Sequence, residues 1–332
     1  MASAQFYNLI RTYLDYDRLH QAAGAWLDYR LSLASRKPHL RHYPPAVMLE
    51  PTNHCNLQCP MCPSGNGTLT RERGFMPWER YQKIIDNIYK KVGLLILWNQ
   101  GEPFLHPNFY DMLDYANHKK LFTMISTNAS LPLDLKRLHL AKPGKLIISL
   151  DGISEATYNS YRINGDHKQV LENLRAMSQI PSLRAALVWQ FIVMRQNEHE
   201  VAQAMDIARE LKIRLELKTV QIYHPDEIPF LPSNPSYSRY KIKGGEFRIK
   251  TDLLNRCRRL WTQPVINQDG EFSICCYDKD LAIPIGNIDT HSFEDLWFGE
   301  RMNRMRQQIL TDRKQLPICQ NCGEGIVQRI KT

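Results

Sequence analysis

Short apolar runs alternate with amphipathic stretches along most of the chain, from residue 46 to about residue 220. The apolar runs have the length of β-strands, and the stretches between them carry apolar residues at helical spacing. The predicted strands are residues 46–49, 94–98, 122–126, 146–150, 187–193 and 213–217. The predicted helices are residues 78–90, 107–119, 133–141, 168–179 and 198–211. The alternation indicates an α/β fold with a parallel sheet, barrel-like or doubly wound, whose ligands bind at the carboxyl ends of the strands.

Residues 1–45 are predicted to form a helical N-terminal arm. Apolar residues recur at helical spacing over residues 6–14, and a second short pattern follows Gly24. Three prolines then end any helix: Pro38, Pro44 and Pro45. Two interpretations of the arm stay open, namely packing against the main domain and an amphipathic element for peripheral contact with a membrane surface or a partner.

The alternation of strands and helices stops near residue 220. Residues 224–255 contain four prolines and are typical of a loop-rich bridge. A hairpin is predicted at residues 264–277, with Asp269-Gly270 at its turn, and an amphipathic helix at residues 292–311. The predicted organisation is therefore an arm (1–45), a barrel domain (46–223), a bridge (224–255) and a C-terminal module (256–332).

Composition narrows the class of protein. Hydrophobic residues make up 43% of the chain and charged residues 23%, as in an ordinary globular protein. No apolar run is long enough to span a bilayer, and no signal peptide is recognisable, so a cytoplasmic location is expected. The net charge is +9, but the basic clusters do not interleave with aromatic residues, and no nucleic-acid partner is expected. In a reducing compartment, the eight cysteines are expected to be ligands or reactive thiols.

Three cysteines lie close together just after the first predicted strand. Cys55, Cys59 and Cys62 have the spacing C-x3-C-x2-C, and this loop lies at the carboxyl edge of the predicted sheet. A zinc site prefers a fourth ligand nearby, and only His54 is close. Three thiolates suit an iron–sulfur cluster that leaves one iron open to a non-protein ligand.

This spacing resembles the signature of the radical S-adenosylmethionine (SAM) enzymes, and the resemblance extends over residues 46–325. In that family the open iron of a 4Fe–4S cluster binds SAM. An electron from the cluster cleaves SAM, and the resulting 5′-deoxyadenosyl radical removes a hydrogen atom from the substrate. The resemblance implies a partial (β/α)6 barrel related to the TIM barrel, and an electron donor such as flavodoxin or ferredoxin.

Further motifs of the family follow successive strands. Gln100-Gly101-Glu102-Pro103 is similar to the family's G-G-E-P, with glutamine in place of the first glycine. The resemblance implies that Gly101 and Glu102 meet the amino group of SAM, and a carboxylate facing an ammonium is sound chemistry. Met61, between two cysteines of the signature, is assigned to the same SAM-binding set.

The next three strands carry the remaining predicted SAM contacts. The stretch S-T-N-A is similar to S-T-N-G, and its Asn128 is expected to hydrogen-bond to SAM. The stretch S-L-D-G matches S-x-D-G, which implies that Ser149 and Asp151 contact the ribose or carboxylate of SAM. Arg162 is expected to clamp a carboxylate, and Gln190 to face the same pocket.

The other five cysteines resemble the C-terminal extension of the SPASM and twitch subfamilies. That extension has a cysteine, then G-x4-C, then a distal C-x2-C. The resemblance implies that four thiolates ligate one auxiliary 4Fe–4S cluster: Cys257, Cys275, Cys319 and Cys322. A full SPASM domain holds two such clusters and needs more cysteines, so the one-cluster, twitch-like version is expected. A zinc site with four cysteines is the alternative.

Cys276 is the spare thiol of this group. Strand geometry predicts that Cys275 and Cys276 point to opposite faces. Three interpretations of Cys276 stay open: ordinary packing, a cluster ligand in place of Cys275, or a hydrogen-atom donor, as in some radical SAM epimerases.

The sequence therefore predicts a radical SAM enzyme whose substrate is its least defined feature. Oxidation or epimerisation of a small polar or carbohydrate-type substrate is the first expectation. Modification of a peptide, as by maturases of ribosomally made peptides, or of a protein is the alternative; the short stretch before residue 46 disfavours it. A remote alternative is a non-catalytic iron–sulfur or zinc scaffold that binds nucleic acid.

Overall fold

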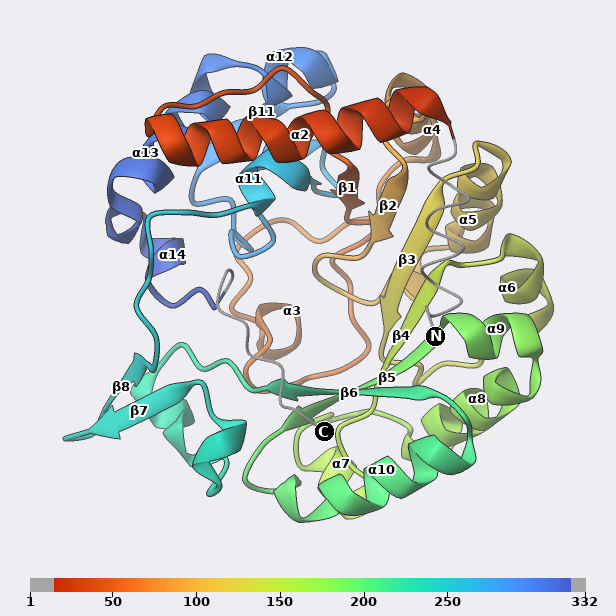
Figure 1. Cartoon of the computed structure of the whole chain (residues 1–332). Helices are drawn as coiled ribbons and strands as arrows, with labels where there is room; N and C mark the ends of the chain where they lie inside the picture. The colour runs from red at the N-terminus through yellow and green to blue at the C-terminus, as the bar shows by residue number, and fades with distance from the viewer. Residues whose placement is uncertain (1–14, 324–332) are drawn as a thin grey trace.

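The computed structural model of the chain describes residues 15–323, and its centre is a curved sheet with helices on the outside (Figure 1). Nine strands form this sheet in the order β11-β10-β9-β1-β2-β3-β4-β5-β6. Strands β1 to β6 are mutually parallel, with Ala46 opposite Leu94 at the start of the register. Their bounds are β1 (Ala46–Leu49), β2 (Leu94–Leu97), β3 (Phe122–Thr127), β4 (Lys145–Ser149), β5 (Leu187–Val193) and β6 (Arg214–Thr219). The predicted α/β class and partial barrel are confirmed.

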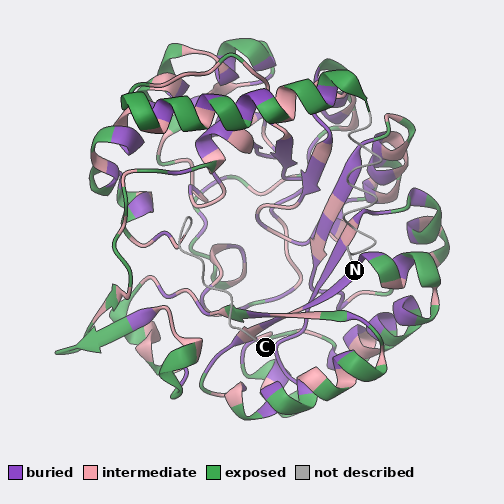
Figure 2. Ribbon diagram, in the orientation of Figure 1, coloured by how far each residue is buried: buried purple, intermediate pink, exposed green. Residues whose placement is uncertain are grey.

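The helices between these strands bury one face against the sheet and expose the other, as Figure 2 shows. In α4, three isoleucines at helical spacing, Ile84, Ile85 and Ile88, are almost wholly buried. Aspartates begin two of the other helices by capping a free backbone N–H: Asp134 accepts from Arg137 N, and Asp166 from Gln169 N. The outer helices are α4 (Trp78–Ile88), α5 (Phe109–His118), α6 (Leu135–Ala141), α8 (His167–Gln179), α9 (Pro181–Ala186) and α10 (Val201–Glu210).

The N-terminal arm contains one continuous helix, α2 (Tyr16–Ser35), which does not break at Gly24 as the second predicted pattern implied. A Cβ on Gly24 would lie 2.2 Å from the His42 ring, so glycine is needed for the returning chain to pack here. The helix packs against α11 (Arg259–Thr262), whose Trp261 donates its indole N–H to Ser32 Oγ at 3.1 Å. The interpretation that the arm packs on the main domain therefore holds for α2, whereas the pattern predicted over residues 6–14 lies outside the described residues.

The outer face of α2 remains apolar. Five large hydrophobic residues on it are exposed: Tyr16, Leu19, Trp26, Leu27 and Leu31. Over residues 15–323, however, none of the helices combines the length and apolar character that crossing a bilayer requires. Contact of α2 with a membrane surface stays a prediction.

The segment predicted as a loop-rich bridge contains a β-hairpin that the sequence interpretation missed. Strands β7 (Tyr240–Lys243) and β8 (Glu246–Ile249) pair antiparallel, separately from the main sheet. Gly244 and Gly245, both with positive φ, form the tight turn between them. Two short 3₁₀ helices precede the hairpin, η3 (Pro225–Phe230) and η4 (Pro235–Tyr237).

The C-terminal module extends the barrel sheet. Strand β9 (Val265–Ile266) pairs parallel to β1, with Met48 opposite Val265. Strands β10 (Glu271–Ser273) and β11 (Pro284–Asn287) add antiparallel. The helix predicted at residues 292–311 is two helices, broken at Gly299, where a Cβ would lie 2.1 Å from Asp295 O. Besides α11, the module's helices among the described residues are α12 (Phe293–Trp297), α13 (Glu300–Asp312) and α14 (Pro317–Gln320), with a 3₁₀ turn η5 (Arg313–Gln315).

Candidate active site

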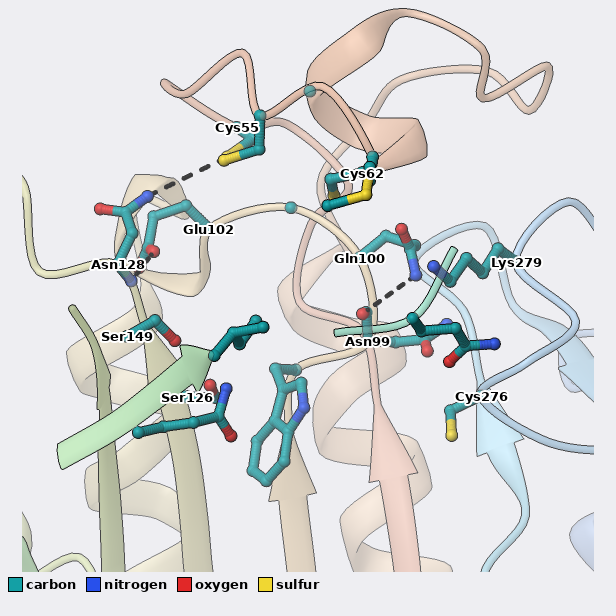
Figure 3. A pocket seen from close by; sticks show the side chains of 18 of the residues that line it. Cys55, Cys62, Asn99, Gln100, Glu102, Ser126, Asn128, Ser149, Cys276 and Lys279 are labelled. Carbon is teal, nitrogen blue, oxygen red and sulfur yellow. Dashed lines mark hydrogen bonds between the residues drawn. The ribbon is translucent and has the colours of Figure 1, made fainter. Parts of the chain in front are cut away.

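A cavity of about 560 Å³ lies between the loop after β1 and the carboxyl ends of the barrel strands. Every barrel strand or the residue that follows it contributes to its lining: Met48, Ile96, Trp98, Met124, Ser126, Ser149, Gln190, Ile192, Lys218 and Val220. The opposite wall comes from the C-terminal module, which includes Cys276 and Lys279 (Figure 3). The extended sheet therefore brings barrel and module to one cavity.

The three cysteines of the signature face this cavity from the loop between β1 and α3 (Pro63–Asn66). Cys62 N donates to Cys59 O at 3.1 Å, which folds the loop tightly. All three are free thiols. Burial, together with Glu102 and the other two cysteines, raises the pKa of Cys55 to about 12, although a backbone N–H opposes the shift.

These thiols fit an iron–sulfur cluster. Three thiolates this close repel one another, and a positive metal centre among them removes that penalty. Within residues 15–323, no three His, Cys, Asp or Glu side chains are arranged to share a single metal ion. A 4Fe–4S cluster, by contrast, binds each cysteine through a different iron.

Glu102 lies buried beside this loop, at the start of the short 3₁₀ helix η1 (Pro103–Leu105). Its carboxylate accepts from Thr127 Oγ1 at 2.7 Å and from Asn128 N at 2.7 Å, so β3 holds it in place. Burial raises its pKa to about 7, against the opposing effect of these hydrogen bonds. The group is thus poised to accept a cation that enters the cavity.

Gly101 lets the chain reach this position. Its φ is +74°, and a Cβ would lie 2.5 Å from His54 O and 2.6 Å from Thr52 O. Glu102 N in turn donates to His54 O at 2.7 Å. The loop after β2 therefore packs directly against the cysteine loop, which requires glycine at 101. The departure at Gln100 is accommodated, since its Oε1 accepts from Ser64 Oγ at 3.2 Å.

The other predicted SAM contacts divide into those that face the cavity and one that does not. Met61, Asn128, Ser149, Gln190 and Arg162 line it. Asn128 Nδ2 donates to Asn56 Oδ1 at 2.9 Å and lies 4.0 Å from Cys55 Sγ. Ala129 has φ +52°, a backbone conformation that explains why the related motif carries glycine there.

Asp151 is the exception. It is fully buried and does not belong to the cavity lining. Its Oδ2 accepts from Arg162 Nε at 2.7 Å, and its Oδ1 from Ile192 N at 2.6 Å. Asp151 therefore lies behind the residues that line the cavity, where it orients Arg162, and its contact with SAM stays a prediction.

A buried ion pair, missed by the sequence interpretation, lies beneath these loops. Glu50 follows β1 and is fully buried, and both of its carboxylate oxygens accept from Arg71 Nη2 at 2.9 Å. It also accepts from Asn99 Nδ2 at 3.2 Å and Gln100 N at 3.1 Å, and Gln268 N approaches at 3.5 Å. One carboxylate thus connects the cysteine loop, the loop after β2 and the C-terminal module.

Four of the remaining cysteines gather inside the C-terminal module, where each is buried: Cys257, Cys275, Cys319 and Cys322. Burial and the neighbouring Cys322 raise the pKa of Cys257 to about 12, although Arg313 opposes this. Burial also raises the pKa of Cys319 to about 11. Four clustered thiols beside the Arg313 guanidinium form a donor set that fits a fully ligated cluster.

Cys276 is separated from that group. It faces the main cavity, as Figure 3 shows, and Arg259 Nη1 donates to its sulfur at 2.9 Å. Cys275, by contrast, is buried near Cys257 and Cys319. The two neighbouring thiols therefore point to different places, and the geometry favours Cys275 as the ligand.

Comparison with known proteins identifies two domains. The radical SAM superfamily model matches residues 49–208, and an iron–sulfur cluster-binding domain model, SPASM, matches residues 257–323. These domains imply a 4Fe–4S cluster, auxiliary iron–sulfur binding and SAM as cofactors.

Individual relatives agree with this assignment. PqqA peptide cyclase of Bradyrhizobium diazoefficiens is 27% identical over 54% of this chain and 47% of its own length. The chain thus spans about half of that relative. The tungsten-containing aldehyde ferredoxin oxidoreductase cofactor-modifying protein of Pyrococcus furiosus is 23% identical over 83% of this chain and 86% of its own.

Among solved structures, Streptococcus suis SuiB bound to precursor peptide SuiA has the same fold. Its TM-score is 0.64 at 15% identity, covering 89% of this chain and 72% of that chain. The family models, the curved parallel sheet and the two groups of cysteines agree. The chain therefore belongs to the radical SAM superfamily, with a SPASM domain at residues 257–323.

Proposed function

We propose that this radical SAM enzyme modifies a peptide held in the cavity between the two groups of cysteines. The observation that carries the proposal is that the signature cysteines and the C-terminal module face one cavity of about 560 Å³. One relative is named a peptide cyclase, and one solved structure with the same fold is bound to a precursor peptide. Both favour a peptide over the small polar or carbohydrate-type substrate that was first expected.

The residues around the first cysteines have separate tasks in this proposal. Cys55, Cys59 and Cys62 would hold the cluster, and SAM bound there supplies the radical that removes a hydrogen atom from the substrate. Glu102 would bind the ammonium of SAM, because its buried carboxylate lines the cavity and is fixed by hydrogen bonds from Thr127 at the end of β3 and Asn128 after it. Arg162, oriented by Asp151, would hold a carboxylate.

The buried cysteines of the SPASM domain would hold an auxiliary cluster: Cys257, Cys275, Cys319 and Cys322. Because their wall borders the substrate cavity, that cluster would be near enough to accept an electron from the substrate. Loss of one hydrogen atom and then of one electron and one proton leaves a substrate oxidised by two electrons, which is the balance of a cross-link within a peptide.

Epimerisation is the second candidate, and the position of Cys276 favours it. Its thiol faces the cavity beside Arg259. Transfer of its hydrogen would break the S–H bond and form a C–H bond on the substrate, leaving a sulfur radical that the electron donor, predicted to be flavodoxin or ferredoxin, would have to reduce. Cys276→Ala would then abolish formation of the epimer but leave a cross-link unaffected.

The experiment that tests the proposal measures two products. Anaerobically reconstituted protein with dithionite and SAM is expected to release 5′-deoxyadenosine, and a Cys55/Cys59/Cys62 triple alanine variant to release none. A panel of short peptides and a panel of sugars are then supplied, and mass spectrometry follows each. A peptide that becomes lighter by about two hydrogens supports the proposal, whereas turnover of a sugar with inert peptides would overturn it.

A further inference from the structure

The cavity is apolar where β1, β2 and β3 form its floor. Side chains alternate along a strand, so every second one faces the interior of the barrel. Met48, Ile96 and Met124 are the ones that line the cavity here. Met48 lies opposite Ile96 in the register, and Ile96 lies opposite Met124, so the three side chains form one continuous apolar row. With neighbouring strands about 4.8 Å apart, the row is roughly 10 Å wide.

Trp98 extends the apolar row beyond the end of β2. It follows Ile96 by two residues, lines the same cavity and packs against the same apolar cluster. Within residues 15–323, its indole N–H has no hydrogen-bond acceptor, whereas Trp189, Trp261 and Trp297 each donate to a backbone carbonyl. A tryptophan inside a protein usually has a partner for this N–H. The donor of Trp98 is therefore available to a molecule in the cavity.

The charged groups of the cavity lie on its other sides. In the part of the chain that the structure describes, β1, β2 and β3 contribute no charged residue to the lining. Lys218 comes from β6, and Lys279 comes from the C-terminal module. The apolar row also ends where charge begins, because Lys145 on β4 lies opposite Met124 and pairs with Glu216 at 3.2 Å. The row is therefore an apolar wall distinct from the charged ones.

The apolar row lies deep in the cavity. Figure 3 shows Ser126 on the side away from Cys55 and Cys62, and Met124 precedes Ser126 by two residues on β3. A group that contacts the row is thus held on the far side of the cavity from these cysteines, and the rest of the molecule can extend toward them. Full burial of a leucine or phenylalanine side chain here would improve affinity by about tenfold to 150-fold.

We propose that Met48, Ile96, Trp98 and Met124 form a subsite that binds one apolar side chain of the substrate peptide. The Trp98 N–H donates to an oxygen of the same residue and so orients it. A polar side chain of similar shape would lose more hydrogen bonds to water than Trp98 can replace. The inference rests on the proposed function, because it names the kind of residue that the peptide presents to the cavity.

The test uses three capped tripeptides as probes, acetyl-Gly-X-Gly-amide with leucine, phenylalanine or asparagine as X. Asparagine has nearly the shape of leucine but is polar. Isothermal titration calorimetry on the anaerobically reconstituted enzyme, without reductant, measures binding before any reaction. The leucine and phenylalanine probes are expected to bind at one saturable site, at least tenfold more tightly than the asparagine probe.

Variants locate that site. Met124→Gln keeps the length of the side chain and should weaken binding of the leucine probe at least fivefold, whereas Met124→Leu should stay within twofold of the wild type. Trp98→Phe keeps a ring but removes the N–H, and should weaken binding about 2–10-fold. The matched control Met205→Gln alters a half-buried methionine on α10, which does not line the cavity, and should have no effect. Iron content and the Kd for SAM are expected to match the wild type throughout.

The outcomes separate the alternatives. Equal Kd values for the three probes, or no saturable binding of any of them, would overturn the proposal. A loss in Met124→Gln no larger than in Met205→Gln, at unchanged iron content, would overturn it too. So would a parallel rise in the Kd for SAM, because the apolar row would then contact SAM. If the apolar probes bind as expected but no peptide is modified, the proposed function fails while the subsite remains.

Discussion

Replacing Glu50 by glutamine should destabilise the enzyme far more than removing an ion pair from its surface. The Glu50→Gln change keeps the shape of the side chain but removes its charge. Arg71, whose side chain is 4% exposed, then keeps only the more distant Asp269, whose Oδ2 lies 3.7 Å from its Nη1, as a counter-ion. In the wild type, Arg71, Asn99 and Gln100 all donate hydrogen bonds to the Glu50 carboxylate. The NH₂ group of the new glutamine would therefore face other donors and find no acceptor among them.

The size of the effect follows from that burial. Breaking a buried ion pair by removing one partner costs about 3–5 kcal/mol. At the roughly 2 °C per kcal/mol that applies to large domains, the midpoint of thermal unfolding should fall by about 6–10 °C. The control is Asp206→Asn on α10, whose partner Arg209 is 73% exposed. That change should cost less than about 1 kcal/mol, or at most roughly 2 °C.

Circular dichroism and cluster absorbance, followed during heating of the anaerobically reconstituted variants, measure both effects. Glu50→Leu combined with Arg71→Met should recover part of the loss, since no fully buried charge then remains unpaired, although Gln100 N loses its acceptor. The reasoning is refuted if Glu50→Gln unfolds within 2 °C of the wild type. It is also refuted if the double variant is no more stable than the single one.

Four further predictions concern the site and its surroundings. Gly101→Ala forces alanine into a positive φ, which costs about 1–2 kcal/mol, and also brings the new Cβ against His54 O. The variant should bind SAM at least tenfold more weakly in equilibrium dialysis. A Kd within twofold of the wild type would contradict this. Cys275→Ser should lose the auxiliary iron and Cys276→Ser should retain it, as iron and sulfide assays will show; the reverse result would exchange their roles. The pKa of Glu102 is raised from 4.5 to about 7, so its carboxyl group is protonated below about pH 7. The affinity of the wild type for SAM should therefore fall about tenfold per pH unit below that value, whereas the affinity of Glu102→Gln should be weak at every pH. A wild-type affinity that does not change between pH 5.5 and 7 would exclude this role. On the exposed face of α2, Arg30 lies 5.6 Å from the centre of the Trp26 ring, and this face should bind vesicles that contain phosphatidylglycerol. A Trp26→Ser/Leu27→Ser variant should lose at least half of that binding in a sedimentation assay. If the wild type does not sediment with such vesicles, the arm has no role in membrane contact.

The barrel could be predicted from the sequence because most of its strands, such as β1 and β5, are apolar and buried along most of their length, although β6 is largely polar and partly exposed. Residues 187–193, for example, coincide with β5 as predicted. The hairpin of β7 and β8 was missed because each strand is only four residues long, carries exposed charged residues and follows a segment with four prolines. The parallel pairing of β9 with β1 was missed as well, since two residues of pairing leave no periodicity in the sequence.

The candidate site divides in the same way. The cysteines and Glu102 could be assigned because fixed spacings bring them together locally. The place of Asp151 behind Arg162 depends on how residues 151 and 162 fold back on each other, which a motif does not encode. Lys218, Arg259 and Lys279 carried no signal, because each is an ordinary surface residue type until the extended sheet assembles them around one cavity.

The contact between α2 and Trp261 has a consequence for how the chain is made. The two partners, Ser32 and Trp261, are 229 residues apart. At about 5–20 residues per second, the ribosome delivers Trp261 roughly 10–50 s after Ser32. Through that interval, the face of α2 that packs against α11 is uncovered. The nascent chain therefore exposes α2 to the ribosome and its chaperones long before the contact with Trp261 can form. Expression from residue 46 onward would avoid that exposure but would leave the indole N–H of Trp261 without the acceptors that the arm provides.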